Sequence, residues 1–278
     1  DIAAAAAAAD TTEAQRKAIL DDLAATLSAE DAYAVSASEA ARARQSKNLE
    51  LFEEIGTRRL PPAVQAALKA VQPQLRRLDT ARQENLRVAR DRLEAFLARL
   101  SDYRVLDPAC GSGNFLYVAL HALRDLELRA LIEAERLTGL QSPAPRVGLQ
   151  CVRGIEIEPY AAELARVTLW IGDLQWSLKN GFRNWPRPIL STLDQIENRD
   201  ALLNPDGTEA EWPVVDAIVG NPPFLGDRKM IADIGEDYVT QLRKVFKGRV
   251  PGGADFVTYW VEKAWRYVNP LPAGEGMS

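Results

Sequence analysis

The chain has 278 residues, of which 47% are hydrophobic and 26% charged, a balance that is typical of globular proteins and excludes a wholly disordered chain. The formal net charge of −5 argues against a protein whose entire surface binds nucleic acid, but it leaves room for a local basic groove. A single histidine argues against histidine-based metal sites and Ser/His/Asp catalysis, and we expect no metal. Two cysteines and the lack of any apolar stretch of about 18 residues predict a cytoplasmic protein without a membrane span or signal peptide.

The two ends of the chain indicate a fragment. The first residue is Asp1, and residues 3–9 are an unbroken alanine run, either a genuine helix or a stretch of unidentified side chains, of which we favour the latter. At the other end, a polar tail at 270–278 follows a helical segment where an α/β protein normally continues into another strand. We therefore expect the fold to be truncated at its carboxyl end.

Residues 11 to about 100 are predicted to be helical throughout. Leu20, Leu23 and Leu27 recur at the helical period, with Thr11 or Thr12 as the N-cap residue. Further amphipathic runs follow at 38–55, after the Pro61-Pro62 pair, which is typical of a helix start, and at 86–100. We assign 1–100 to a helical N-terminal region and 101–278 to a separate domain.

From residue 103 the pattern changes to strands that alternate with helices. Strands are predicted at 103–107, at 147–157, within 188–201 and, as a very apolar buried strand, at 214–219; helices are predicted at 114–137 and 161–176. This alternation predicts an α/β fold with a Rossmann-like, doubly wound and mostly parallel sheet. The long first crossover indicates an insertion around 126–146. Such sheets bind ligands beyond the carboxyl ends of their strands.

A glycine turn follows the first predicted strand and opens a helix. It reads Asp-Pro-Ala-Cys-Gly-Ser-Gly-Asn-Phe over 107–115, and Gly111 and Gly113 let a ligand approach the backbone N–H groups. Asp107 is an acceptor suited to a cationic ligand group. The third glycine of a dinucleotide fingerprint and the lysine of a P-loop are both missing, so pyrophosphate binding is disfavoured.

Acidic residues follow the next two predicted strands. Glu156 and Glu158 end the second strand, and an acid there can accept hydrogen bonds from both hydroxyls of a ribose. Alternation points both to the same side; we favour Glu156 for this role and assign Glu158 to the start of the following helix. Asp200 follows the third strand, where it is either an acceptor for an exocyclic amine or an ordinary acid in a polar loop.

Asn221-Pro222-Pro223-Phe224 directly follows the fourth predicted strand. The two prolines fix the backbone and remove two N–H donors, so the turn is rigid and rich in acceptors. The Asn221 side-chain oxygen and the Pro222 carbonyl can both accept hydrogen bonds from one planar amine, and Phe224 offers a ring on which a base can stack. A plain turn also tolerates Asn-Pro, but a second proline and an aromatic are harder to explain in that way.

The last part of the chain is rich in basic and aromatic residues. The basic ones either contact DNA phosphates or form a solvated surface, and the pattern does not choose between these alternatives; they are Arg228, Lys229, Arg243, Lys244, Lys247 and Arg249. The aromatic ones have helical spacing and are predicted to pack in the core, as are Trp170 and Trp176; they are Phe256, Tyr259, Trp260 and Trp265. Phe115 is interpreted either as a neighbour of a ligand or as a core residue.

The two motifs together resemble those of amino-group DNA methyltransferases that use S-adenosylmethionine, and most closely those of the N6-adenine enzymes of bacterial restriction-modification and phage-defence systems, which have the class I methyltransferase fold. The order of the motifs is similar to the gamma-type arrangement, and the resemblance covers roughly 103–270. It implies that 101–278 is an incomplete catalytic domain. The implied cofactor contacts are Asp107, Ala109, Gly111, Gly113, Asn114, Glu156 and Asp200, and the implied catalytic residues that hold a flipped adenine are Asn221, Pro222, Pro223 and Phe224.

The resemblance also implies partners and leaves alternatives. Double-stranded DNA is the expected substrate, read by a target-recognition domain or by other defence-system subunits that this sequence does not contain. We therefore expect the fragment alone to be inactive. The same turn also occurs in enzymes that methylate other planar amines, namely cytosine N4, an RNA guanine or a protein glutamine. A non-catalytic scaffold in a defence complex is the alternative from another class.

Overall fold

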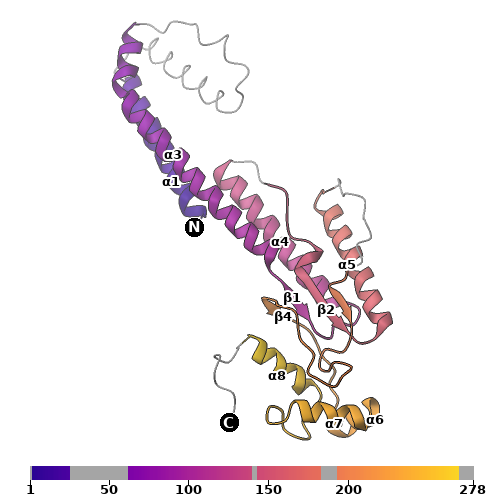
Figure 1. Cartoon of the computed structure of the whole chain (residues 1–278). Coiled ribbons are helices and arrows are strands. Elements are labelled where there is room, and N and C mark those ends of the chain that lie inside the picture. The colour runs from indigo at the N-terminus through magenta and orange to yellow at the C-terminus, as the bar shows by residue number, and fades with distance from the viewer. Residues whose placement is uncertain (1, 26–61, 140–142, 183–192, 269–278) are drawn as a thin grey trace. The chain divides into compact units, whose positions relative to one another are not determined.

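The computed structural model describes residues 2–25, 62–139, 143–182 and 193–268. The chain divides into two compact units (Figure 1). The first comprises Asp1–Phe96 and Leu131–Ser142, and the second comprises Leu97–Ala130 and Pro143–Ser278. Within the described residues, no helix combines the length and apolar character that a membrane span requires. The amphipathic run expected at 38–55 lies outside the described residues.

The first unit contains helix α1 (Ile2–Ala25) and most of helix α3 (Pro62–Asp102). Ion pairs join the two helices, with Arg16 Nε 3.2 Å from Asp79 Oδ1 and Arg82 Nε 3.3 Å from Glu13 Oε2. Helix α3 starts at Pro62, as predicted, and the runs on both sides of Pro73 belong to one helix. Helix α4 (Asn114–Thr138) has its last residues in this unit, because residues 131–142 are assigned to it.

The prediction that Thr11 or Thr12 caps the first helix was wrong. Helix α1 already begins at Ile2, since the alanine run is a strong helix former and continues the helix backwards. Both threonines lie inside the helix, where their hydroxyls donate to backbone carbonyls one turn earlier: Thr11 to Ala7 at 2.9 Å and Thr12 to Ala9 at 2.7 Å. Such a bond satisfies the hydroxyl without ending the helix.

The second unit is built on a parallel sheet of four strands in the order β3-β2-β1-β4. The strands are β1 (Val105–Asp107), β2 (Val152–Glu156), β3 (Ile196–Asn198) and β4 (Ala217–Ile218). Helix α4 leads from β1 to β2, and helix α5 (Pro159–Lys179) leads from β2 to β3 (Figure 1). The predicted α/β fold with a parallel sheet is confirmed. Because β2 and β4 pair with opposite edges of β1, the strand order reverses there, which is where such sheets bind ligands.

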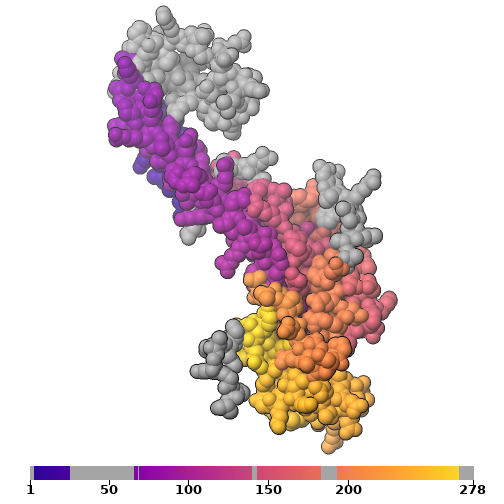
Figure 2. All heavy atoms as spheres, viewed as in Figure 1, coloured from indigo at the N-terminus to yellow at the C-terminus, as the bar shows by residue number. Residues whose placement is uncertain are grey.

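Helices cover both faces of the sheet, because successive side chains of a strand point to opposite faces. Gly154 of β2 faces α4: a Cβ atom at this position would lie 2.9 Å from Leu116. Leu106 and Ile155 point the other way, into a core cluster with the carboxyl-terminal helices. These are α6 (Asp227–Ile234), α7 (Glu236–Val245) and α8 (Val257–Val268), which form one packed body of orange to yellow atoms in Figure 2.

Helices α4 and α5 are joined by a buried ion pair. Arg124 Nη2 lies 2.6 Å from Asp173 Oδ1, and the same guanidinium donates to the Ser177 hydroxyl at 3.1 Å. Trp176 is buried beside them, as predicted, and its indole nitrogen donates to Asp125 at 2.7 Å. Trp170 is only half-buried.

Three of the predicted strands are shorter than expected. Strand β1 begins at Val105 and not at residue 103. Strand β2 begins only at Val152, because a 3₁₀ turn at Leu149–Cys151 precedes it. The fourth strand was expected to be buried over 214–219, but only Ala217 and Ile218 pair, both are half-buried, and Val214 is 88% exposed. The reason is that β4 pairs with β1 alone and forms an edge of the sheet within the described part of the chain.

The aromatic residues of the last helix divide between core and surface. Phe256, Tyr259 and Trp260 are buried, which confirms their predicted packing role. Trp265 was also expected in the core, but it is 68% exposed. Phe256 directly precedes α8, and with 3.6 residues per turn Trp265 lies about 140° around that helix from Trp260, away from its buried side.

Candidate functional site

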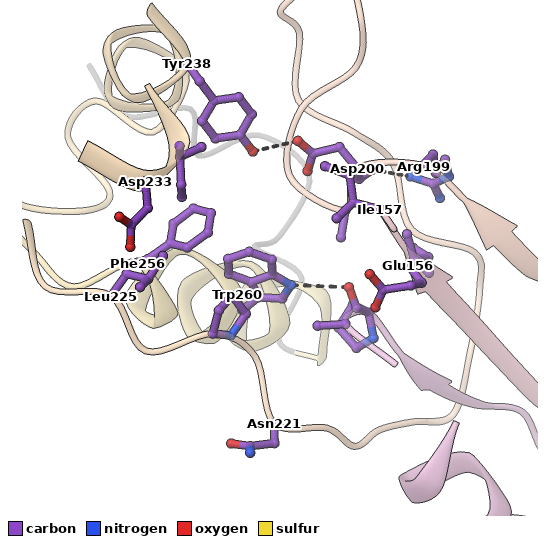
Figure 3. A pocket seen from close by; sticks show the side chains of 16 residues that line it. Glu156, Ile157, Arg199, Asp200, Asn221, Leu225, Asp233, Tyr238, Phe256 and Trp260 are labelled. Carbon is purple, nitrogen blue, oxygen red and sulfur yellow. Dashed lines mark hydrogen bonds between the residues drawn. The ribbon is translucent and has the colours of Figure 1, made fainter. Parts of the chain in front are cut away.

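The carboxyl ends of all four strands meet in one pocket of the second unit (Figure 3). Its volume is about 720 Å³, within the range of small-molecule sites. The strand ends contribute Pro108, Ala109, Ile155, Glu156, Ile157, Arg199, Asp200, Ala201, Asn221 and Pro223. The remaining lining comes from the segment after β4 and from the helices that follow, with Leu225, Asp233, Ile234, Tyr238, Phe256 and Trp260.

Asp107 carries a buried carboxylate at the end of β1. The residue is 1% exposed, and its Oδ1 accepts a hydrogen bond from the Ala109 N–H at 3.0 Å. Its Oδ2 is buried and accepts no hydrogen bond from the described residues. Burial raises the pKa of this carboxyl to about 6, and the charge of Glu156 also raises it, although the Ala109 N–H opposes both effects. A buried acceptor without a donor is suited to a cationic ligand group.

Gly220 brings the turn after β4 directly against Asp107. A Cβ atom at Gly220 would lie 2.5 Å from Asp107 Oδ1, closer than any side chain could approach. The φ angle of Gly220 is +154°, which also favours glycine. Two motifs that are more than a hundred positions apart in the sequence are therefore in contact at the edge of the sheet.

Glu156 joins the glycine turn to the end of β2. Its Oε2 accepts the Gly111 N–H at 2.7 Å, and its Oε1 accepts the Glu158 N–H at 2.9 Å. Glu158 itself is exposed at the start of α5, makes no side-chain capping bond and does not line the pocket. Of the two acids between which sequence spacing could not choose, the structure places only Glu156 in the pocket.

Gly113 and Asn114 lie outside the pocket lining. A Cβ atom at Gly113 would lie 3.1 Å from the Ala165 Cα atom, so this glycine lets the turn pack closely on α5. Its φ of +83° requires glycine as well. Asn114 is exposed at the start of α4, and so is Phe115 at 49%, which contradicts the alternative that Phe115 is a core residue.

Asp200 lines the pocket but is already hydrogen-bonded within the protein. Its Oδ1 accepts the Leu202 N–H at 2.7 Å, and its Oδ2 accepts the Tyr238 hydroxyl at 2.6 Å (Figure 3). Sequence reasoning missed Tyr238, because nothing in its local pattern distinguishes it from other residues of an amphipathic helix.

The Asn-Pro-Pro-Phe turn reaches the pocket through Asn221 and Pro223. Asn221 is exposed and lies away from Tyr238 in the view of Figure 3. Pro222 and Phe224 do not line the pocket, and Phe224 is 70% exposed, which leaves its ring free to stack on a base from outside.

Two of the six basic residues after this turn serve internal contacts. Arg243 pairs with Asp227, and Arg249 bonds both Glu209, at 2.5 Å, and Glu262, at 2.6 Å. These two arginines hold the unit together. The other four are exposed, namely Arg228, Lys229, Lys244 and Lys247.

The thiol of Cys110 is unsuited to nucleophilic chemistry. Burial raises its pKa to about 12, and the negative charges of Asp107 and Glu156 act in the same direction. In the described residues, no cluster of three or more His, Cys, Asp and Glu side chains is arranged to hold a metal ion.

Comparison with known proteins places these features in a family. The family model of the MmeI DNA-methyltransferase domain matches residues 80–274. DNA methyltransferase A of Bacillus subtilis (strain 168) is 31% identical over 194 residues, which cover 66% of this chain and 21% of that protein. A solved structure of the type IIL restriction-modification enzyme MmeI in complex with DNA is 28% identical, with a TM-score of 0.45, and the match covers 64% of this chain and 24% of that one. The chain thus spans about a fifth to a quarter of the length of these relatives.

Proposed function

The chain belongs to the MmeI DNA-methyltransferase domain family, and from this premise we propose that its pocket transfers a methyl group from S-adenosylmethionine to N6 of an adenine flipped out of double-stranded DNA. The reaction would serve a restriction-modification or phage-defence system. Recognition of the DNA sequence would be the task of a target-recognition domain or of other subunits.

One observation carries the proposal: residues suited to the methyl donor and a residue suited to the target amine line the same pocket. Glu156 and Asp200 lie at the ends of β2 and β3, and Asn221 follows β4. The contact between Gly220 and Asp107 fixes the two turns against each other. Methyl transfer needs the donor and the acceptor side by side, so a shared pocket is its first geometric requirement.

The residues around the pocket fit the methyl donor. The unpartnered Oδ2 of Asp107 would accept from the ammonium group, Glu156 would accept from the ribose hydroxyls, and Asp200 would accept from the adenine amine. The glycine turn, with Ala109, Gly111, Gly113 and Asn114, would enclose the methionine part. When bound, the cofactor supplies an electrophilic methyl group on a sulfonium. The backbone N–H groups of Gly111 and Glu158 already hold the Glu156 carboxylate in place.

The Asn-Pro-Pro-Phe turn would hold the target base. The Asn221 side-chain oxygen and the Pro222 carbonyl accept hydrogen bonds from the amine, and Pro222 and Pro223 keep the turn rigid. With its protons held, the amine directs its lone pair into the pocket. The exposed ring of Phe224 would stack on the extruded adenine, offsetting part of the few kcal/mol that flipping costs.

The substitution Asn221→Ala in the full-length protein tests this assignment. Transfer of tritiated methyl groups to DNA should fall by about 10²-fold or more, as on the loss of a group that stabilises the transition state, whereas binding of S-adenosylmethionine should be nearly unchanged. Asn180→Ala is the matched control, because Asn180 ends α5 and lies outside the pocket. Undiminished transfer by Asn221→Ala would rule out its catalytic role.

A further inference from the structure

Tyr238 and Asp200 form a hydrogen bond between two distant elements of the pocket wall. Asp200 follows β3, whereas Tyr238 is in the first turn of α7. The phenol oxygen lies 2.6 Å from Asp200 Oδ2, and both residues are half-buried (Figure 3). This distance is typical of a hydroxyl that donates to an ionised carboxylate, which is stronger than a bond between neutral groups.

The proton in this pair belongs to the tyrosine. Burial and the adjacent carboxylate raise the pKa of Tyr238, so the phenol remains protonated and donates. A phenol has one proton. Because the Tyr238 hydroxyl uses it to donate a hydrogen bond to Asp200, the phenol oxygen can only accept further hydrogen bonds. Asp200 is likewise acceptor-only, and its Oδ1 is held by the Leu202 N–H. This part of the pocket therefore presents two hydrogen-bond acceptors from adjacent side chains.

Apolar side chains pack around Tyr238 and hold it in place, whereas the charged Arg199 lies beside Asp200 and donates to its backbone carbonyl at 3.2 Å. The Tyr238 ring packs edge-on against Phe256, with centroids 6.5 Å apart and an interplanar angle of 82°. Ile157, Ile234 and Phe256 line the same pocket. Gly235, between α6 and α7, has a φ of +102° and allows the sharp corner that positions Tyr238. Apolar side chains beside a pair of acceptors suit a planar ring that carries an amino group.

We propose that Tyr238 is a positioning and specificity residue: by donating to Asp200 it fixes that carboxylate and creates an acceptor pair that selects a 6-aminopurine over a 6-oxopurine in the methyl donor. This inference rests on the proposed function, because it takes Asp200 as the partner of the donor's adenine. A 6-oxo group would place a third acceptor at the position where the 6-amino group places a donor, and the ring proton of a 6-oxopurine lies one position away, on N1. Sites built to receive a hydrogen bond reject ligands that cannot make it.

Calorimetric titration with two nucleosides tests the inference in the full-length protein. The probes are S-adenosylhomocysteine and S-inosylhomocysteine, which differ in the 6-amino and 6-oxo groups and the attendant ring proton. The wild type should prefer the adenosyl compound, and Tyr238→Phe should lower this preference about tenfold, the effect of one hydrogen bond. The loss should lie mainly in adenosyl affinity.

Tyr267→Phe is the matched control. This substitution also removes a phenol hydroxyl, which accepts a hydrogen bond from the Val215 N–H and donates one to the Pro213 carbonyl. Tyr267 does not line the pocket. The preference of the Tyr267→Phe variant for the adenosyl compound should equal that of the wild type. Thermal unfolding verifies that each variant is folded. Should Tyr238→Phe not fold, Asp200→Asn replaces it, since an amide at this position exchanges an acceptor for a donor and should also lower the preference.

The outcomes separate the two proposals. Suppose that the wild type prefers the adenosyl compound. If Tyr238→Phe keeps that preference, or binds both compounds equally more weakly, then Tyr238 does not determine specificity, and the proposed function stands. If the wild type binds neither compound, the proposed function is wrong, and the role of Tyr238 is wrong with it.

Discussion

Replacing Asp107 with asparagine should stabilise the sheet-containing unit near neutral pH while it weakens binding of the methyl donor. The wild-type carboxylate is buried, with one oxygen unpartnered among the described residues, and its pKa is about 6 instead of the ordinary 3.8. The folded protein therefore resists ionisation of this group. Asparagine has nearly the same shape, and its side-chain oxygen can still accept the Ala109 N–H.

The magnitude follows from the two pKa values. A difference of about 2 corresponds to about 3 kcal/mol of destabilisation when the carboxyl is fully ionised in both states. Well below pH 3.8 the carboxyl is protonated in both states and this cost is absent. Between pH 4 and 6 the unfolded chain releases its proton first, so stability falls as the pH rises, and above pH 6 the whole cost applies. The unpartnered amide of the variant costs about 1–2 kcal/mol at every pH.

Urea denaturation of the wild type and of Asp107→Asn between pH 4 and 7.5 measures this effect. The free energy of unfolding of the variant relative to the wild type should rise by about 2 kcal/mol over this range, because part of the full cost is already present at pH 4. Calorimetry should show a large loss of S-adenosylmethionine affinity at pH 7.5. The wild-type affinity should itself decline below about pH 6, because the ammonium group would then meet a protonated carboxyl.

Asp233→Asn is the control for this experiment. Asp233 lines the pocket, which Asp107 does not, but it is exposed, so the same chemical change relieves no burial. The free energy of unfolding of Asp233→Asn relative to that of the wild type should stay constant over the pH range. A constant difference between Asp107→Asn and the wild type, or undiminished donor binding by Asp107→Asn, would refute the reasoning about this carboxylate.

Two further pairs of substitutions, each a test with its control, concern close packing and buried ion pairing. Gly113→Ala should lower the free energy of unfolding by about 2–3 kcal/mol, because the φ of Gly113 is +83° and the new methyl group meets α5. Gly111→Ala should lower it by only about 1 kcal/mol, because Gly111 has a φ of +52° and open space around it. Equal losses in urea denaturation would contradict the packing role of Gly113. Arg124→Met should cost about 3–5 kcal/mol by leaving the buried Asp173 unpaired, while Arg136→Met, which removes an exposed ion pair, should cost less than about 1 kcal/mol. Thermal unfolding of these two variants checks that difference, and similar losses would show that burial of the Arg124 pair is unimportant.

The location of the pocket could be predicted from the sequence because its residues follow strand signals. Glu156, Asp200 and Asn221 each come directly after a β-type run, and a parallel sheet collects the carboxyl ends of its strands at one edge. The glycine turn directly follows the first β-type run, so it could be placed at the same edge of the sheet. Local pattern and the rules of parallel topology were sufficient for these features.

The contacts between these residues could not be predicted, because they join segments with no local relation. The Tyr238 hydroxyl meets Asp200 across 38 positions, and Gly220 touches Asp107 across a still longer separation. Tyr238 occupies an ordinary position in an amphipathic helix. Only the packing of α7 over the strand ends gives it a role in the pocket wall.

The wrong predictions share a cause, since each inferred burial or a boundary from the local sequence alone. Val214 belongs to an apolar run, but β4 has a single neighbour in the described sheet and leaves this residue exposed. Trp265 is large and apolar, yet it points away from the buried side of α8. Thr11 is a good capping residue, but the alanines before it favour the helical conformation, so the helix begins before Thr11.

Nucleoside analysis of methylated DNA tests the central claim most directly. The full-length protein would be incubated with tritiated S-adenosylmethionine and double-stranded DNA, after which the DNA is digested and its nucleosides are separated. We expect the label to elute as N6-methyldeoxyadenosine. Label in N4-methylcytosine would contradict the proposed base, and the absence of label from DNA, with the donor bound, would contradict the proposed reaction.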